Sequence, residues 1–435
     1  MESLALMPKY EAYKDSQVQW IGDIPANWHL EKAKWLFYKA DRKPLVDDDI
    51  VTCFRDGQVT LRKNRRTEGF TNALKEHGYQ RICKGDLVIH AMDAFAGAIG
   101  VSDSDGKSTP VYAACVPRKI GKVNSYYYAY YMRDLALSGF IVSLAKGIRE
   151  RSTDFRFNDF AELLLPFPDY EEQTLIANFL DKKTALIDEA ISIKEQQISL
   201  LKERKQIIIQ QAVTQGLDPN VPMKDSGVDW IGKIPAHWDI VPGFTVFKEG
   251  KDSNKGMIES QVLSLSYGNV IIKPEEKLVG LVPESFETYQ IALPGDIIIR
   301  CTDLQNDKTS LRTGIVRNKG IITSAYLNLR LKTEHSAEFM HYFLHVLDIT
   351  KTIYRFGSGL RQNLSYKDFK HMRILMPPKA EQIEIVNYIN NQVEVTESSI
   401  DLIKNKIEKL KEYKTTLINS AVTGKIKITP EMVEQ

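Results

Sequence analysis

The sequence contains little cysteine and no long apolar run. Its four cysteines are spread over 435 residues without a C-x-x-C pair, which argues against both a disulfide framework and a thiolate zinc site. No stretch approaches the roughly 20 apolar residues that span a bilayer. The opening residues lack the basic start and the apolar core of a signal peptide. These absences predict a soluble, cytoplasmic protein with reduced, mostly buried thiols.

The motifs of the common catalytic sites are also missing. In GVSDSDGKS (100–108) the glycines stand six apart, where a phosphate-binding loop needs five, and Pro110 follows where a helix should begin. His341 and His345 are spaced to share one helix face with Glu338, but no H-E-x-x-H motif is present, so ordinary packed or surface histidines are expected. We therefore predict no catalytic residues, no metal site and no cofactor in this chain.

An internal repeat sets the domain organisation. The segment DSQVQWIGDIPANWHL (15–30) recurs as DSGVDWIGKIPAHWDI (225–240), with ten of sixteen positions identical. Further matches follow in the same order, namely KGDLVI with PGDIII, PFPDYEEQ with MPPKAEQ, and QAVTQG with SAVTGK. A repeat of this kind fixes the domain count before any local structure is considered. The chain is therefore predicted to be two copies of one unit, each with a mixed globular part followed by a long helix.

Two stretches carry the heptad pattern of a coiled coil. In the first, apolar residues alternate at spacings of four and three once Lys194 and Lys205 take seam positions, and in the second Lys414 is equivalent to Lys205. A helix lying on its own globular part is the alternative, but such sustained heptads favour two helices packed on each other. The residues expected at this helix seam are Ile187, Ile191, Ile198, Leu201, Ile208, Ile400, Ile403, Ile407, Leu410 and Leu417.

Chain connectivity sets the direction of these helices. The first leads from one globular part to the other over ~45 residues, or roughly 70 Å, so the second must fold back. We predict an α+β fold in which two similar globular domains are separated by two long antiparallel helices and related by a pseudo-twofold axis. The expected boundaries are 1–165 and 221–375 for the globular domains, and 166–220 and 376–435 for the helical segments.

The charge is nearly balanced overall but unevenly distributed. Residues 1–165 carry 24 basic and 21 acidic side chains, and residues 221–375 carry 20 and 17, whereas both helical segments are net acidic. A modest positive excess on the two globular domains is what contact with a polyanion at both ends would require. The pattern favours nucleic acid at the globular domains and protein along the helices.

Together, the tandem SxxxWIGxIPxxW openings, the Gly and Arg loops, the Pro-Glu-Gln helix entries and the AVT helix ends resemble the specificity subunit of type I restriction-modification enzymes. The resemblance covers nearly the whole chain, in both halves and in order. It implies two target-recognition domains that each read one half of a split, asymmetric site in double-stranded DNA, and two helices that dock two methyltransferase subunits. It also implies that this chain is non-catalytic, that S-adenosylmethionine belongs to the methyltransferase partner, and that ATP and Mg belong to the restriction subunits.

Base reading in the major groove requires forked donors and amides, as in Arg to guanine and Asn or Gln to adenine. The Gly and Arg loops supply such residues, namely Arg149, Arg151 and Arg156 in the first domain and Arg361, Gln362 and Asn363 in the second, with Lys367 nearby. A separate basic stretch, Arg62, Lys63, Arg65 and Arg66, is expected on phosphates. Two alternatives stay open: a solvated loop for the basic stretch, and helix C-terminal capping for the loop arginines.

The repeated tryptophans and the overall function also have competing interpretations. Trp20 with Trp28 and Trp230 with Trp238 recur in both halves, and we interpret them as packing anchors, because base readers should differ between domains that read different sequences. A helical scaffold that joins two protein partners without touching DNA is the main functional alternative. A restriction enzyme whose catalytic domain lies elsewhere is a third. Salt-dependent duplex binding separates the first two.

Overall fold

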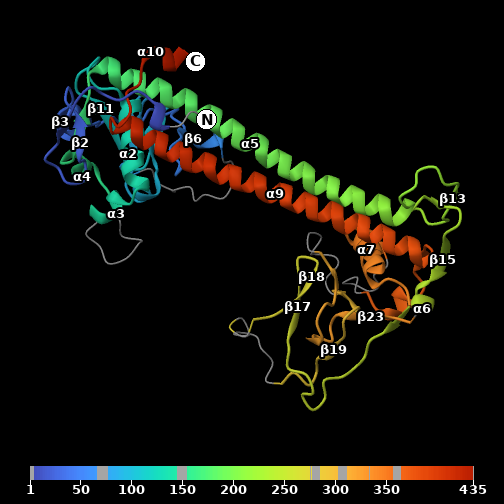
Figure 1. The fold of residues 1–435 in the computed structure, drawn as a ribbon. Helices are drawn as coiled ribbons and strands as arrows, with labels where there is room; N and C mark the ends of the chain where they lie inside the picture. Colours follow the sequence, from blue (N-terminus) through green and yellow to red (C-terminus); the bar gives the residue numbers. More distant parts are fainter. Residues whose placement is uncertain are drawn as a thin grey trace. The chain divides into compact units, whose positions relative to one another are not determined.

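The computed structural model describes residues 4–65, 77–144, 154–274, 276, 285–301, 311–332, 334–355 and 364–434. The chain divides into two compact units: unit 1 is Met1–Lys194 with Asn405–Gln435, and unit 2 is Glu195–Lys404. Each unit holds one α/β domain and one part of each of the two long helices (Figure 1). In the part of the chain that is described, no helix is long and apolar enough to cross a membrane.

The long helices are α5 (Tyr170–Gln215) and α9 (Lys379–Val422). Asp169 caps the start of α5, because its Oδ1 accepts a hydrogen bond from the backbone N–H of Glu172 at 2.8 Å. Both helices end at a glycine with positive φ, Gly216 and Gly424, a conformation that satisfies the last carbonyls and costs glycine nothing sterically. Residues 166 and 167, which the sequence interpretation placed in a helical segment, belong instead to a short strand that precedes α5.

The α/β domain of unit 1 is built on a four-stranded antiparallel sheet with the strand order β4-β11-β8-β9. Smaller antiparallel pairs, β1-β2, β3-β12, β5-β6 and β7-β10, surround it. The strands are β1 (Tyr13–Asp15), β2 (Asp23–Pro25), β3 (His29–Lys32), β4 (Phe37–Lys39), β5 (Val51–Cys53), β6 (Val59–Leu61), β7 (Gln80–Ile82), β8 (Leu87–His90), β9 (Ile99–Val101), β10 (Gly106–Ser108), β11 (Tyr112–Pro117) and β12 (Leu164–Phe167). The short helices are α1 (Ala33–Leu36), α2 (Ser125–Leu137), α3 (Phe140–Leu144) and α4 (Phe157–Ala161).

Unit 2 repeats this sheet order, with β16-β23-β20-β21 as its four-stranded antiparallel sheet. The pairs β13-β14, β15-β24, β17-β18 and β19-β22 accompany it. The strands are β13 (Met223–Asp225), β14 (Lys233–Pro235), β15 (Asp239–Pro242), β16 (Phe247–Glu249), β17 (Leu263–Ser266), β18 (Asn269–Ile272), β19 (Gln290–Ala292), β20 (Ile297–Ile299), β21 (Thr313–Ile315), β22 (Gly320–Ile322), β23 (Leu327–Leu331) and β24 (Arg373–Met376). The helices are α6 (Gly243–Val246), α7 (Ala337–Ile349) and α8 (Tyr366–Phe369), while α10 (Pro430–Glu434) closes the chain in unit 1.

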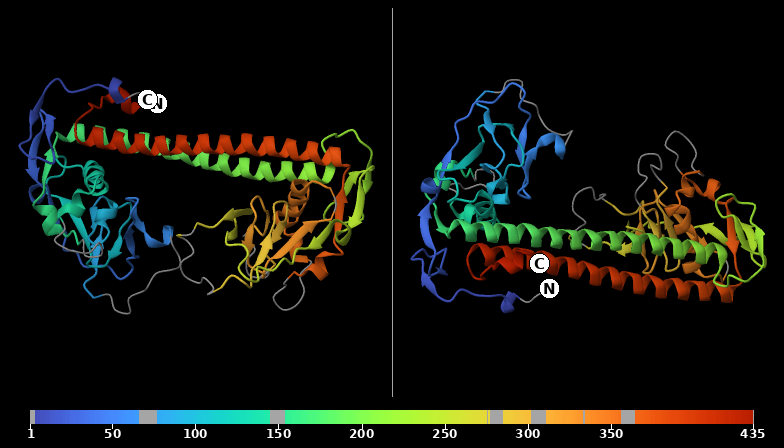
Figure 2. Two further views of the ribbon diagram at one scale, coloured as in Figure 1. Left: turned by 60° about the horizontal axis from the view of Figure 1, so that its bottom comes forward. Right: turned by 90° about the horizontal axis from the view of Figure 1, so that it is seen from above.

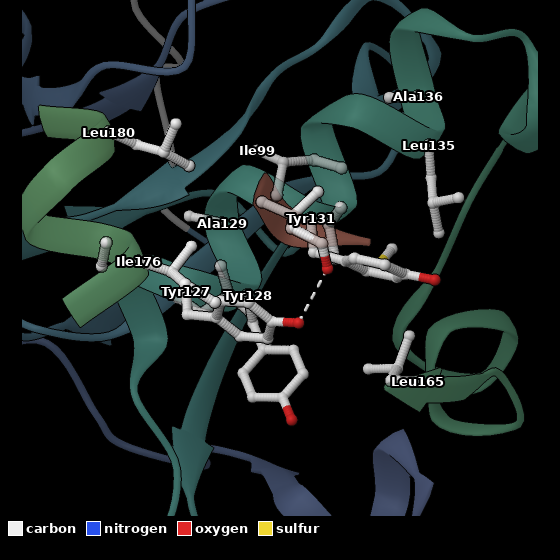
Figure 3. Close-up of a cluster of buried hydrophobic side chains, with 14 of the residues drawn as sticks. Ile99, Tyr127, Tyr128, Ala129, Tyr131, Leu135, Ala136, Leu165, Ile176 and Leu180 are labelled. Carbon is white, nitrogen blue, oxygen red and sulfur yellow. Dashed lines mark hydrogen bonds between the residues drawn. The ribbon is translucent and has the colours of Figure 1, made fainter. Parts of the chain in front are cut away.

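Aromatic residues on α2 form the centre of the unit 1 core. Tyr127, Tyr128 and Tyr131 are almost completely buried, and Figure 3 shows them on α2 beside Ile176 and Leu180 of α5. The buried phenol groups find acceptors: Tyr127 Oη donates to the carbonyl of Val422 at 2.9 Å, and Tyr128 Oη to that of Pro166 at 3.1 Å. One hydrophobic core therefore joins the α/β domain to both long helices within this unit.

Within each unit the two long helices run antiparallel. In unit 1, Lys414 of α9 contacts Asp188 of α5, and the first turns of α5, around Ile176, share a core with the last turns of α9, around Ala421. In unit 2 the last turns of α5, around Val213, share a core with the first turns of α9. Figure 2 shows the paired segments lying along each other inside each unit. Apolar residues at heptad spacing bring this contact about, because they place one stripe on each helix.

Candidate nucleic-acid interface

The basic stretch lies at the end of the β5-β6 hairpin, where residues 62–64 form a single 3-10 turn. Arg62 Nε donates to Thr52 Oγ1 at 3.2 Å. Lys63 forms an ion pair with Asp49 at 2.5 Å. Arg65 forms one with Asp56 at 2.7 Å and also lies over the ring of Phe54, 4.3 Å from its centroid. These three cations therefore gather at one hairpin. To contact DNA, Lys63 and Arg65 would have to exchange their aspartate partners for phosphate groups. Arg66 lies outside the described residues.

The Gly and Arg loop of the first domain is described only from Asp154 onward, so Arg149 and Arg151 lie outside the described residues. Arg156 is strongly exposed, and its Nε is 2.6 Å from Asp154 Oδ2. Its backbone N–H donates to Asp159 Oδ2 at 2.9 Å, which caps α4. Arg156 also lines a cavity of about 290 Å³ with Lys39, Met92 and other residues. This arginine is the N-cap residue of α4, and its side chain pairs with Asp154.

In the second domain, Arg361, Gln362 and Asn363 lie outside the described residues, and Lys367 is exposed on α8. The residues where both loops re-enter their domains are held in the same way. The backbone N–H of Phe155 donates to the carbonyl of Ala91 at 3.0 Å, and that of Leu364 to the carbonyl of Cys301 at 3.2 Å. Both contacts are made just beyond the second strand of the four-stranded sheet in chain order, β8 or β20, so each loop returns to an equivalent place.

Two pairs of a half-buried arginine with a buried aspartate explain the repeated Gly-Asp motifs and were missed in the sequence. Arg42 makes two hydrogen bonds to Asp86 of KGDLVI, at 2.6 and 3.0 Å. Arg330 makes two to Asp296 of PGDIII, at 2.8 and 2.7 Å. The hydrogen bonds that the guanidinium groups donate to these carboxylates raise the pKa of both arginines. Each aspartate also accepts from a turn backbone N–H, so these arginines brace the sheet and are already satisfied.

A glutamine at the start of each long helix attaches the helix to its α/β domain. Gln173 is fully buried; its Oε1 accepts from the backbone N–H of Asn124 at 2.8 Å, and its Nε2 donates to the carbonyl of Pro168 at 2.8 Å. Gln382 is fully buried in the same way; its Oε1 accepts from the N–H of Ser336 at 3.0 Å. Asn124 and Ser336 are the N-cap residues of α2 and α7. The repeated Glu-Gln motif therefore attaches each α/β domain to the start of its long helix.

A second hydrogen bond attaches each α/β domain to its long helix, about two turns further along that helix. Tyr130 of α2 donates to Asp181 of α5 at 2.7 Å, and Tyr342 of α7 donates to Asn390 of α9 at 2.6 Å. Two polar contacts on the same long helix, together with the shared core, define the orientation of the α/β domain better than one contact does. Each α/β domain is thus held in a fixed orientation relative to the helix pair of its own unit.

An ion pair crosses between the two long helices in each unit. In unit 1, both carboxylate oxygens of Asp188 lie within 2.7 Å of Lys414 Nζ. In unit 2, Lys205 pairs with Glu397. Among the predicted seam residues, Ile187, Leu410 and Leu417 belong to the buried core of unit 1 with Ile191 packed against it, Ile400 and Ile407 are buried, and Ile198, Leu201, Ile208 and Ile403 are half-buried.

Both long helices also carry exposed apolar residues outside the predicted seam positions. On α5, Leu186 and Ile193 in unit 1 and Leu200 and Ile207 in unit 2 are all exposed, each seven residues from the next. Val395 and Leu402 of α9 are exposed at the same interval. We call this set the outer stripe. Large apolar side chains aligned on an otherwise polar helix are typical of a protein-docking face.

The comparisons with known proteins agree on one family. No protein-family model matches the chain. The chain is 22% identical to a Methanocaldococcus jannaschii protein named as the type I restriction enzyme MjaX specificity subunit, over 97% of this chain and 98% of that protein. The chain resembles the specificity subunits of type I restriction enzymes. The resemblance inferred from the motifs is therefore confirmed.

Two solved structures share the fold of this specificity-subunit-like chain. The first comes from work on complex assembly and conformational transition of the type I R-M system, with a TM-score of 0.66, 15% identity, and coverage of 92% of this chain and 98% of that chain. The second is the HsdS subunit from Thermoanaerobacter tengcongensis, with a TM-score of 0.55, 15% identity, and coverage of 93% and 98%. Together with the mixed helix and strand content, they establish the specificity-subunit fold.

Proposed function

We propose that this chain is the sequence-specific DNA-recognition subunit of a type I restriction-modification complex. In this proposal residues 1–165 and 221–375 are target-recognition domains, and each reads one half of a bipartite, asymmetric site in double-stranded DNA. The long helices α5 and α9 form one antiparallel coiled coil with a pseudo-twofold axis. The chain itself is non-catalytic; S-adenosylmethionine belongs to the methyltransferase partner, and ATP and Mg belong to the restriction partner.

The repeated attachment of each α/β domain to its helices carries this proposal. Gln173 and Gln382 make matching contacts to the N-caps of α2 and α7, and Tyr130 and Tyr342 make matching second contacts. A domain that reads one half-site at a set distance from the other half-site needs a defined orientation on the helices to which it is attached. A scaffold that joins two protein partners has no such need, so the rigid attachment favours DNA reading.

The proposed DNA contacts divide into base readers and phosphate binders. Base reading is assigned to the Gly and Arg loops, with Arg149, Arg151 and Arg156 in one domain and Arg361, Gln362 and Asn363 in the other, because forked donors and amides suit base edges. Phosphate contact is assigned to the basic stretch 62–66 and to Lys367. The outer stripe supports docking of two methyltransferase subunits along the helices, since it presents apolar side chains without a partner in the described chain.

Methylation mapping tests the proposal directly. The chain is expressed with a methyltransferase subunit of a type I system, and methylated adenines are mapped across a genome with and without this gene. The expected result is methylation at one split sequence that appears only when the chain is present. Purified complex should also bind a duplex carrying that sequence with an affinity that falls steeply with salt. Protein assembly without salt-sensitive duplex binding would favour the scaffold alternative.

A further inference from the structure

The cavity of about 290 Å³ in unit 1 lies beside the place where the Gly and Arg loop re-enters the first domain. Three of its lining residues are buried where β8 ends and β11 begins, namely Ala91, Tyr112 and Ala113. The backbone N–H of Phe155 donates to the carbonyl of Ala91, so the loop returns to the domain at the wall of this cavity. The cavity therefore adjoins the loop to which base reading is assigned.

Two exposed cations line the cavity and offer free N–H groups. Lys39, the last residue of β4, has no hydrogen bond or ion pair with any residue that the structure describes. The Nε of Arg156 lies 2.6 Å from Asp154 Oδ2, while its two Nη groups have no partner in the described part of the chain. Asp154 thus orients the guanidinium and leaves its outer N–H groups for another acceptor. The lining is positively charged and rich in donors.

The elements that carry these two cations are packed alike in both units. In unit 1, Phe37 of β4 packs against Phe160 of α4, with ring centroids 5.8 Å apart. In unit 2, Phe247 of β16 packs against Phe369 of α8, with ring centroids 5.7 Å apart. All four rings are fully buried. The first strand of each four-stranded sheet therefore has the same position relative to the short helix that follows the loop.

The charged residues on this repeated frame differ between the units. Lys39 ends β4, and Glu249 ends the equivalent strand β16, where it pairs with Lys251. Arg156 is the N-cap of α4, and Ser365 is the N-cap of α8. Residues that only support the fold should repeat, as the phenylalanines do, whereas residues that read bases should differ between domains that read different half-sites. Lys39 and Arg156 meet the second condition.

The donors of this cavity match one base edge in the major groove better than the others. Guanine presents two acceptors there, O6 and N7, whereas adenine presents N7 beside an amino donor. Thymine presents a single acceptor beside its methyl group, and cytosine presents an amino donor. An ammonium group is a donor only, as is a guanidinium group. A wall that carries both groups therefore favours guanine.

We propose that Lys39 is a specificity-determining residue that reads a guanine in the half-site bound by residues 1–165, with Arg156 beside it. This inference rests on the proposed function and adds to it a residue outside the Gly and Arg loops, together with the base that this residue reads. Glu249 supplies no donor at the corresponding place in unit 2, so the second half-site is read differently there.

Binding of duplexes to the complex of this chain with methyltransferase subunits tests the proposal. The split sequence found by methylation mapping defines the cognate duplex, and each base pair of both half-sites is then exchanged in turn. Lys39→Ala should weaken binding of the cognate duplex about tenfold, and it should abolish discrimination at one G·C pair only. That pair should lie in the half-site whose discrimination Arg156→Ala also reduces, and the other half-site should be read as before.

Two further variants separate base reading from other roles of a lysine. Lys39→Gln offers a donor and an acceptor, which suit adenine, so it should shift the preference at the same pair from G·C towards A·T. Lys119→Ala, at an exposed position of the same domain outside the cavity lining, is the matched control and should leave all discrimination unchanged. The thermal transition of each variant shows that it is folded.

The outcomes distinguish this proposal from the proposed function. If the wild-type complex shows no sequence-specific, salt-sensitive duplex binding, the proposed function fails and the role of Lys39 fails with it. If the wild-type complex reads its split sequence, an unchanged profile of folded Lys39→Ala overturns the role of Lys39 alone. Uniform weakening on all duplexes, with a salt dependence reduced by about one contact, would make Lys39 a phosphate contact and would likewise overturn the proposal.

Discussion

The side chain of Gln173 accepts a hydrogen bond from the backbone N–H of Asn124, and Gln382 makes the equivalent contact with Ser336. These contacts link the first turn of each long helix to the N-cap of a helix inside the α/β domain. The residues joined are 49 and 46 apart in sequence. The repeated Glu-Gln motif therefore forms the same attachment in both units, and removing it should change the free energy of unfolding.

Replacing Gln173 by Ala is expected to destabilise unit 1. The change leaves the Asn124 N–H and the carbonyls of Lys122 and Pro168 without their side-chain partner, and each unsatisfied buried group costs about 1–3 kcal/mol. Urea unfolding measures the effect. Gln197→Ala, at an exposed position on the same helix, is the control and should change the free energy of unfolding by less than about 0.5 kcal/mol. Equal effects of the two substitutions would show that Gln173 does not stabilise the attachment of α5 to the α/β domain.

Reversing the ion pair of unit 1 tests the antiparallel register. Asp188→Lys and Lys414→Asp should each destabilise by up to about 1 kcal/mol, because both side chains are partly exposed and such pairs are weak. The double reversal should recover most of the loss, as a double-mutant cycle in unfolding free energy would show. Glu408→Lys, which disturbs only a pair within α9, gives the background. Strict additivity of the two reversals would mean that the helices do not meet in this register.

Several features were accessible from sequence because they depend on local pattern. The heptad spacing identified both long helices, and the faithful repetition of the tryptophans indicated packing anchors; Trp28 and Trp238 are indeed fully buried. The cysteines were expected to be reduced and mostly buried, and Cys53, Cys115 and Cys301 are free and buried. Periodicity and repetition need only neighbouring residues, so these inferences required no tertiary information.

Other features depend on residues that meet only in the folded chain. Arg42 and Asp86 are 44 positions apart, and neither position distinguishes a bracing arginine from a DNA contact. The Glu-Gln motif was recognised as a helix start, but the partner of Gln173 lies in another element. Arg133 carried no sequence signal, because its close contact with Gly57 arises from the hairpin geometry.

Adjacent leucines on α5 separate the helix seam from the outer stripe. Leu201 is a predicted seam residue and half-buried, whereas Leu200 is 64% exposed. Leu201→Asp should lower the free energy of unfolding by more than about 1 kcal/mol, because it places a charge between apolar helices. Leu200→Asp should leave unfolding unchanged and weaken assembly with the methyltransferase subunit. Thermal unfolding and analytical size exclusion of the mixture read out the two effects. If both variants lose stability equally, the two faces are wrongly assigned.

Under the proposed function, Arg361 and Lys63 should affect DNA binding in different ways. Arg361→Ala is expected to reduce discrimination at the second half-site only, by about 1–3 kcal/mol, since it removes a forked donor from a base edge. Lys63→Ala should weaken binding to all duplexes alike and reduce the salt dependence by about one phosphate contact. Bandshift titrations with duplexes altered in either half-site measure both. Equal loss at both half-sites for Arg361→Ala would remove this residue from the list of base readers.

The buried histidines of unit 2 should make its stability depend on pH. Because burial lowers the pKa of His341 to about 3 and of His345 to about 4, the unfolded chain binds more protons than the folded chain between these values and about 6.5. The stabilisation is complete above about pH 6.5 and is lost as the pH falls, at up to about 1.4 kcal/mol per pH unit for each ring. Urea unfolding from pH 7 to 4.5 measures this slope. His345→Gln should reduce the slope, while His371→Gln, at an exposed position, should not; an unchanged slope in His345→Gln would show that this ring charges freely in the folded protein.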